Sequence, residues 1–356
     1  MQRCECNKKA RHRNFRGRIE RSQTYWKCKR EPALTNGTTD TLTLVTLPEI
    51  RDAAAAIRGV VHRTTQQGST YLSNASGSRV SLKLELFQKT GSFKARGVVN
   101  TLRQLSETER KNGVISLSAG NHAQALAWGA TQLGIQSTIV MPMTAAASKV
   151  AATRGYGGTV IQTDGDLLAT ALAIKEERGL TMVHPFDDLR VIAGSATIGL
   201  EILEDVPDVD VVLVACGGGG LLSGVAAAIK QLKPSVRVIG VEPEGANSMR
   251  LSLDAGSPQR VTQLNTVADG LAAPFAGAHN YQHVKTFVDE LLVIPDSEIL
   301  AGMRVLMERC KLFVEPSAGA AIAPLLSGAL NLALDQCVVP IVCGGNIDLE
   351  RLRTLI

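Results

Sequence analysis

Two lysines, Lys89 and Lys94, flank a short turn in the stretch 84–97, which reads LELFQKTGSFKARG. We expect Ser92 to be the N-cap of a helix, because its hydroxyl can accept from a free backbone N–H of the first turn. Lys94 then lies in that turn, where the helix dipole disfavours an ammonium group. Burial beside Phe93 shifts the lysine pKa in the same direction. An imine-forming lysine needs a neutral amine, so these residues suit Lys94 to that role. The alternative interpretation of Lys94 is an ordinary solvated lysine at the start of a helix.

A second polar stretch lies at a predicted strand-to-helix turn and comprises Ser118, Ala119, Gly120, Asn121 and His122. Gly120 allows the backbone to approach a ligand closely, and the N–H groups of the helix start form an anion site that suits a substrate carboxylate. Asn121 offers both a donor and an acceptor, which suits an oxygen on a cofactor ring. An ordinary helix cap explains these residues about as well.

Four consecutive glycines follow the apolar stretch 211–215 and precede a predicted helix: Gly217, Gly218, Gly219 and Gly220. Such a run costs conformational entropy unless the backbone itself wraps a ligand. A phosphate group at a helix N-terminus is the usual occupant. The run lacks the Lys-Ser/Thr ending of a P-loop, which disfavours ATP.

A nicotinamide-dependent dehydrogenase is a weaker alternative. Glu242 follows the glycines at about the distance expected of a ribose-binding acid. However, Ser223 stands where the third glycine of a dinucleotide-binding fingerprint belongs. Glu242 is better explained as the end of a strand.

The charge of +5 is unevenly distributed. Residues 1–31 hold eleven Lys/Arg and three acids, a balance of +8, so the other residues carry 27 basic and 30 acidic side chains, a balance of −3. The seven cysteines are scattered along the chain, a pattern that argues against a disulfide framework. We therefore expect the protein in a reducing compartment such as the cytoplasm. We expect no secretory signal and no membrane span, because no long apolar run occurs.

Residues 1–42 show no usable periodicity, and we predict that they are mostly disordered. A nucleic-acid-binding arm and an organelle-targeting peptide are the functional alternatives. We expect no nucleic-acid partner, because the rest of the chain has no recognisable nucleic-acid-binding module. Four residues here could be assembled into a zinc site, Cys4, Cys6, His12 and Cys28, but their spacing matches no standard pattern. We therefore predict no metal.

From Thr46 the pattern is that of a globular protein, with strands alternating with helices. We predict strands at 80–87, 114–117, 137–141, 159–163, 181–184, 211–215, 236–241 and 338–342, and helices at 47–61, 93–105, 123–133, 145–154, 166–178, 192–203 and 221–232. This alternation predicts parallel sheets covered on both faces. Two such sheets indicate a two-domain α/β enzyme with a ligand cleft between the domains.

Five motifs occur in order: SFKARG around Lys94, SAGNHAQA from Ser118, GGGG from Gly217, VEPSAG around Glu315 and CGGN from Cys343. Together they resemble the serine/threonine dehydratases of the fold-type-II pyridoxal-phosphate family, which also contains serine racemase. The similarity runs from about Thr46 to the last residue. His122, His184 and Glu315 also have plain explanations, as capped or satisfied polar groups near the ends of strands and helices.

The resemblance implies an imine between Lys94 and the aldehyde of pyridoxal 5'-phosphate, with Phe93 packed beside the ring. Asn121 is expected near the phenolic oxygen, and Cys343 opposite the pyridine nitrogen. The glycine run, together with the backbone amide of Leu221, is expected to surround the phosphate. A thiol opposite the ring nitrogen is a neutral partner, which favours prompt loss of a β-hydroxyl group over side reactions.

The resemblance also implies two three-layer α/β domains with parallel sheets, as in the tryptophan synthase β subunit. Residues 43–112 and 187–356 would form a large cofactor-binding domain, and residues 113–186 a small one. We expect a homo-oligomer, dimer or tetramer, and no C-terminal regulatory domain after the CGGN motif.

Two positions depart from the racemase pattern. Ala119 replaces a serine on the far face of the substrate, so the second proton donor that racemisation needs is missing. Ser248 replaces one of the metal-binding acids, although Glu242 occupies the position of the other, and again we predict no metal. The expected activity is dehydration and deamination of L-threonine or L-serine, with racemases and lyases for other β-hydroxy amino acids as alternatives.

Overall fold

The computed structural model describes residues 26–27 and 43–356, and they contain two separate sheets. The larger has the order β1 (Trp26–Lys27), β10 (Glu290–Ile294), β9 (Arg237–Pro243), β8 (Val211–Ala215), β11 (Cys337–Pro340), β3 (Arg79–Lys83) and β2 (Gln66–Gly68). The five inner strands are parallel, whereas β1 and β2 are antiparallel edges. The central strand β8, VVLVA, is buried throughout, as expected of a parallel strand covered on both faces.

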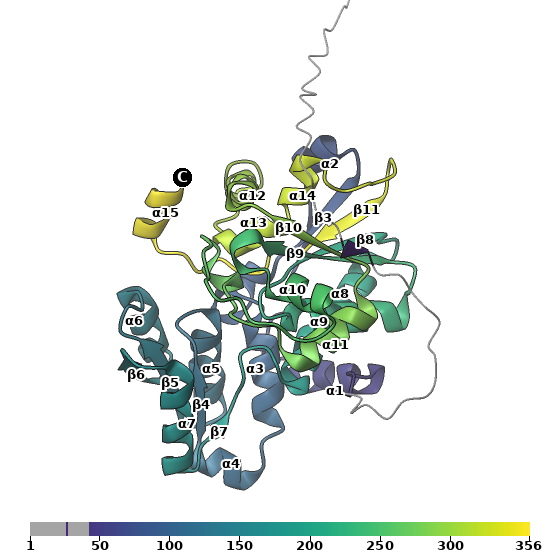
Figure 1. The fold of residues 1–356 in the computed structure, drawn as a ribbon. Coiled ribbons are helices and arrows are strands. Elements are labelled where there is room, and N and C mark those ends of the chain that lie inside the picture. The colour runs from purple at the N-terminus through teal and green to yellow at the C-terminus, as the bar shows by residue number, and fades with distance from the viewer. Residues whose placement is uncertain (1–25, 28–42) are drawn as a thin grey trace, which may run out of the picture.

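The smaller sheet is entirely parallel. Its order is β6 (Thr159–Thr163), β5 (Ser137–Pro142), β4 (Val114–Leu117) and β7 (Thr181–Met182). Its helices are α5 (Asn121–Gln132), α6 (Ala147–Gly155) and α7 (Leu167–Arg178). In Figure 1 these elements form a group set apart from the larger sheet. The predicted α/β class with two parallel sheets is confirmed.

Helices cover both faces of the larger sheet (Figure 1). One layer holds α8 (Leu189–Asp205), α9 (Gly220–Leu232), α10 (Ser248–Ala255) and α11 (Ala278–Phe287); the other holds α2 (Thr70–Ser76), α12 (Asp296–Glu308), α13 (Pro316–Ala320) and α14 (Ala323–Ser327). The remaining α-helices are α1 (Leu47–Ile57), α3 (Lys94–Arg103), α4 (Glu107–Asn112) and α15 (Leu349–Leu355). Helix α3 contacts both α5 of the small group and α8 of the large one. It therefore connects the two sheets, and Lys94 is its first residue.

The start of α3 differs from the prediction in one respect. Phe93, not Ser92, is the N-cap, and no side chain caps the helix. Ser92 instead forms an antiparallel bridge with Gly344, and its hydroxyl has no partner among the described residues. The prediction of Ser92 as N-cap was wrong, because pairing with a distant segment fixes its backbone in an extended conformation. The placement of Lys94 in the first helical turn is confirmed.

Several element boundaries also differ from the prediction. The strand predicted at 80–87 ends at Lys83, and a 3-10 turn follows at Glu85–Phe87 because Phe87 N–H turns back to the carbonyl of Leu84. In the segment predicted to be disordered, Trp26 and Lys27 form β1, so that prediction was wrong for these two residues. The rest of residues 1–42, with the four suggested zinc ligands, lies outside the described residues. In the described part of the chain, no helix is both long and apolar enough to span a bilayer.

Candidate active site

Lys94 opens α3 with its amine directed at the end of the small sheet. Its Nζ atom donates to the carbonyl oxygen of Pro185 at 2.7 Å and lies 5.1 Å from the centre of the Phe93 ring. Burial lowers the pKa of Lys94 to about 8, although the nearby Cys343 and Glu315 oppose this shift. A substantial fraction of the amine is therefore neutral near neutral pH, as the sequence predicted.

Cys343 lies next to the start of α3. Its carbonyl oxygen accepts from Phe93 N–H at 3.1 Å, and the residue is 3% exposed. Burial raises the pKa of the Cys343 thiol well above its usual range, and the neighbouring Glu315 adds to the shift. The thiol is therefore neutral at physiological pH and remains a weak hydrogen-bonding group.

Asn121, the first residue of α5, joins the small sheet to the large one. Its Nδ2 atom donates to Oε1 and Oε2 of Glu315 at 2.8 and 3.1 Å. Its Oδ1 atom accepts from Nδ2 of Asn346 at 2.8 Å. The three side chains come from three distant motifs of the sequence, and these hydrogen bonds join them.

Glu315 is not only a capped or satisfied polar group at the end of an element, the plain explanation offered from the sequence. It is the N-cap of the short helix α13, but its side chain makes no cap hydrogen bond and instead faces Asn121. Burial raises the pKa of Glu315 to about 7, which hydrogen bonding to Asn121 partly offsets. A buried acid that titrates near neutrality, close to a partly buried lysine, is typical of a functional site. The VEPSAG motif was the sequence signal for this residue.

The glycine run lies between β8 and α9. Gly219 has φ of 99°, a conformation that L side chains rarely adopt. The Gly218 carbonyl accepts from Nδ2 of Asn280 at 3.0 Å. In a trans peptide the C=O and N–H groups point in opposite directions, so the Gly219 N–H points away from Asn280. The first N–H groups of α9, including that of Leu221, have no partner within the helix. These N–H groups are available to the predicted anion, and their role stays a prediction.

Pro185 and Phe186 were missed by the sequence analysis. A Cβ atom on Gly218 would come within 2.5 Å of the Phe186 ring, so the ring packs directly against the glycine run. The same segment therefore touches the amine of Lys94 through Pro185 and the glycine run through Phe186. The available signal was its place just after β7, at the carboxyl end of a parallel strand.

His184 caps the segment that follows it. Its Nδ1 atom accepts from the N–H groups of Phe186 and Asp187 at 3.3 and 2.8 Å. The plain explanation of His184 as a capped polar group is confirmed.

The stretch 118–122 connects β4 to α5. Gly120 is the N-cap of α5, and a Cβ atom there would meet nothing within 4 Å, so its backbone faces open space. Ser118 and Ala119 are partly buried in the same turn. The His122 side chain is 2% exposed and lies within 3.0 Å of Ser116 Oγ and 3.2 Å of the Val183 carbonyl, with its pKa lowered to about 3 mainly by burial. The neutral imidazole thus has partners inside the small sheet.

No metal site is evident in residues 26–27 and 43–356, where no three His, Cys, Asp or Glu side chains are grouped to hold an ion. The carboxylate of Glu242 accepts from the N–H groups of Met249 and Arg250, both at 2.9 Å. Its two oxygens are therefore occupied by the start of α10.

The donor set matches a phosphorylated aldehyde with an aromatic ring. The backbone N–H groups of the glycine run suit a dianionic phosphate, and the Lys94 amine suits the aldehyde. The Phe93 ring supplies an aromatic surface beside the lysine. The neutral thiol of Cys343 and the amide of Asn121 offer hydrogen bonds to ring atoms.

Comparison with known proteins agrees with this chemistry. Residues 57–344 match the family model described as "Pyridoxal-phosphate dependent enzyme". The chain belongs to this family. Its cofactor is pyridoxal phosphate, and the chain is a fold-type-II enzyme of the serine/threonine dehydratase and serine racemase group.

Individual relatives of this family cover most of the chain. It is 44% identical over 317 residues to an L-threonine ammonia-lyase of Thermotoga maritima, covering 88% of the chain and 78% of the relative. It is 42% identical over 330 residues to a catabolic L-threonine dehydratase of Staphylococcus aureus, covering 90% and 95%. The solved structure of maize serine racemase superposes with a TM-score of 0.84 at 37% identity, covering 88% of this chain and 97% of that one.

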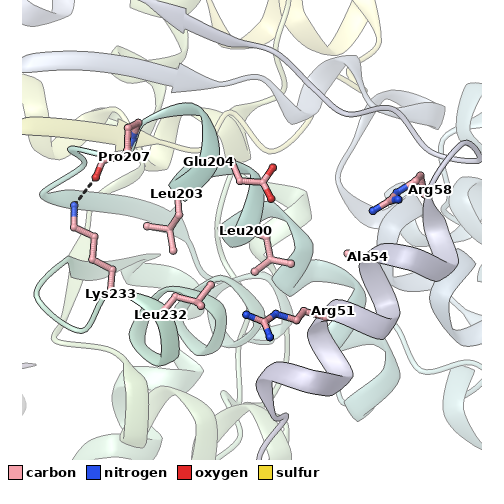
Figure 2. A pocket seen from close by; sticks show the side chains of 9 residues that line it. All are labelled: Arg51, Ala54, Arg58, Leu200, Leu203, Glu204, Pro207, Leu232 and Lys233. Atoms are coloured by element: carbon pink, nitrogen blue, oxygen red, sulfur yellow. Dashed lines mark hydrogen bonds between the residues drawn. The ribbon is translucent and has the colours of Figure 1, made fainter.

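A groove of about 510 Å³ lies elsewhere on the surface, between α1, α8 and the end of α9. Figure 2 shows Arg51 of α1 and Arg58, the residue after this helix, on one side of it, facing Leu200, Leu203 and Leu232. None of the residues discussed above lines it, so this groove is separate from the candidate active site.

Proposed function

We propose that this protein is a pyridoxal-phosphate dependent ammonia-lyase that converts L-threonine or L-serine to a 2-oxo acid and ammonia. The observation that carries the proposal is the partly buried, partly neutral amine of Lys94, positioned by Pro185 in a site that also holds the glycine run. The names of the two dehydratase relatives support the substrate class.

Each predicted site residue is proposed in the role expected from the family pattern. Lys94 holds the cofactor covalently, Phe93 packs beside its ring, Asn121 faces the phenolic oxygen and Cys343 faces the ring nitrogen. The phosphate binds to the backbone of Gly217, Gly218, Gly219, Gly220 and Leu221. The substrate carboxylate binds at the start of α5, at Ser118, Ala119, Gly120, Asn121 and the backbone of His122. The free space beside Gly120 supports this last assignment.

The cofactor, when bound, draws electrons from the bonds of the substrate α-carbon. Lys94 Nζ would accept the α-proton of the substrate as a neutral amine. The β-hydroxyl group leaves with a proton as water, and water then replaces nitrogen at the α-carbon. The balance is one hydroxy amino acid converted to one 2-oxo acid and one ammonia.

Elimination is proposed in preference to racemisation. Lys94 reaches the α-carbon from one face, and the methyl group of Ala119 cannot donate a proton from the other. Serine racemase remains the alternative activity, supported by the maize structure, and lyases for 3-hydroxyaspartate or phenylserine remain alternative substrate classes.

Three further proposals concern the whole molecule. Residues 43–112 and 187–356 form the large domain and residues 113–186 the small one, consistent with the separate sheets. The protein forms a homo-oligomer, and it resides in the cytoplasm, as the free cysteines Cys216, Cys310, Cys337 and Cys343 favour. Light scattering of the purified protein tests the oligomer.

The deciding experiment compares the unaltered protein with Lys94→Ala. The unaltered protein should show the visible absorption of lysine-bound cofactor and release 2-oxo acid and ammonia in equal amounts. Lys94→Ala should lose that band and lower kcat by about 10²–10⁴, the usual contribution of a general base. Normal absorption and turnover in Lys94→Ala would refute the assignment. A panel of β-hydroxy amino acids identifies the substrate.

A further inference from the structure

Asn346, the last residue of the CGGN motif, has no role in the assignments above. Its Nδ2 atom donates to two acceptors, the carbonyl oxygen of Thr90 at 2.7 Å and Oδ1 of Asn121 at 2.8 Å. Both hydrogens of this amide nitrogen are therefore used.

The Thr90 carbonyl decides which way the Asn346 amide faces. A backbone carbonyl can accept but cannot donate, so Asn346 must turn its NH₂ group, not its oxygen, toward Thr90. Thr90 has φ of 60°, in the left-handed region that a β-branched residue seldom adopts. This backbone conformation sets the direction of the carbonyl.

The orientation of the Asn346 amide in turn determines the orientation of the Asn121 amide. Because Asn346 presents N–H groups, Asn121 must present Oδ1 to it, and its Nδ2 atom then faces Glu315. Both oxygens of Glu315 belong to one carboxylate and approach Nδ2 together, which leaves the second hydrogen of this nitrogen for a ligand.

We propose that Asn346 is a positioning residue that makes Asn121 present an N–H donor, rather than its carbonyl oxygen, to the ring oxygen of the cofactor. The proposal rests on the proposed function, in which Asn121 faces that oxygen. We call these contacts the relay: the Thr90 carbonyl orients Asn346, Asn346 orients Asn121, and Asn121 donates to Glu315.

Gly91 supports the proposal independently. A Cβ atom at this position would lie 2.5 Å from Oδ1 of Asn346, and the residue has φ of 74°. Glycine is therefore required next to Thr90 for the Asn346 side chain to reach its two acceptors.

The test titrates apoprotein with pyridoxal phosphate and records the dissociation constant and the absorption maximum of the bound form. Asn346→Ala should weaken binding at least about tenfold and shift the maximum, because Asn121 loses its fixed orientation. In the Asn121→Ala background, the same substitution should change the dissociation constant less than about twofold, since a residue that acts through Asn121 has nothing left to orient.

Asn100→Ala is the matched control. Asn100 is buried, and its Nδ2 atom donates to the carbonyl oxygen of Arg190 at 2.7 Å, so the substitution also removes a buried amide from a backbone acceptor. It should leave both readings unchanged. The relay is refuted if Asn346→Ala leaves affinity and absorption unaltered, or if it lowers affinity equally with and without Asn121. A failure of the proposed function differs, because then the unaltered protein itself would not bind the cofactor.

Discussion

The amine nitrogen of Lys94 and the carbonyl oxygen of Pro185 are 2.7 Å apart, although 91 positions separate the two residues in the sequence. Lys94 begins α3, whereas Pro185 follows the last strand of the small sheet. The next residue, Phe186, packs against Gly218. A single two-residue segment therefore sets the spacing between the lysine and the glycine run.

Cofactor capture by apoprotein should depend on pH through Lys94. The rate should rise about tenfold per pH unit below the Lys94 pKa of about 8 and level off above it, because the free amine is the nucleophile. Stopped-flow absorbance between pH 6 and 10 measures this. Lys89→Ala, at the other end of the turn, should give the same profile. A rate still rising toward about pH 10.4, the ordinary lysine pKa, would show that burial does not lower the Lys94 pKa.

Gly219→Ala should weaken pyridoxal phosphate binding by about tenfold or more. The new Cβ atom would meet Met249 Cε at 2.7 Å and Asn280 Cβ at 2.8 Å, on a backbone with φ of 99°, so the run must move. Gly256→Ala is the matched control, with φ of 73° and nothing within 4 Å of the added atom. Equilibrium titration followed by fluorescence should find normal affinity for the control. Equal affinities for both variants would contradict a phosphate site in this run.

Ala119→Ser should raise the share of racemisation. The unaltered enzyme should give elimination with at most trace D-serine, because reprotonation from the far face needs a positioned acid. Chiral chromatography of L-serine incubated with each form, alongside pyruvate measurement, checks this. Abundant D-serine from the unaltered enzyme would mean that another residue serves as the second acid.

Arg96 should be important for stability. Its guanidinium bonds Glu85 and Glu201 at 2.8 and 2.7 Å, and the side chains of Arg96 and Glu85 are both 0% exposed. Arg96→Ala should lower the free energy of unfolding by about 3–5 kcal/mol, because it leaves the buried Glu85 carboxylate without its cation.

A neighbouring surface pair provides the comparison for Arg96. Arg63 and Glu204 are 51% and 63% exposed, so Arg63→Ala should cost about 0–1 kcal/mol. Denaturant unfolding measures both variants. Similar losses for the two would argue against burial as the origin of the Arg96 effect.

Local patterns in the sequence predicted the elements well. Strands 114–117, 159–163 and 211–215 appear with the predicted bounds, because each is a short β-rich run between clear turn residues. Lys94 lies in the first turn of its helix as predicted, although the Ser92 cap from which this was inferred does not form. The Ser92 cap failed because a bridge to Gly344, far along the chain, outweighs the local preference.

The partners within the site could not be predicted in this way. Asn121 meets Glu315 across 194 positions and Asn346 across 225, and no periodicity encodes such pairings. Pro185 contributes a backbone carbonyl, which any residue could supply, so its type carries no signal. The motifs marked where chemistry occurs, and the fold determines which groups face one another.

The short strand β1 changes how an expression clone should be designed. Trp26 and Lys27 pair with Leu291 and Glu290 of β10, so they close one side of the larger sheet. A version starting at residue 43 would leave the N–H and C=O groups of β10 open to pairing with another molecule. Self-association or precipitation of that version would then come from the uncovered edge of β10. A version that retains Trp26 and Lys27 would keep this edge covered.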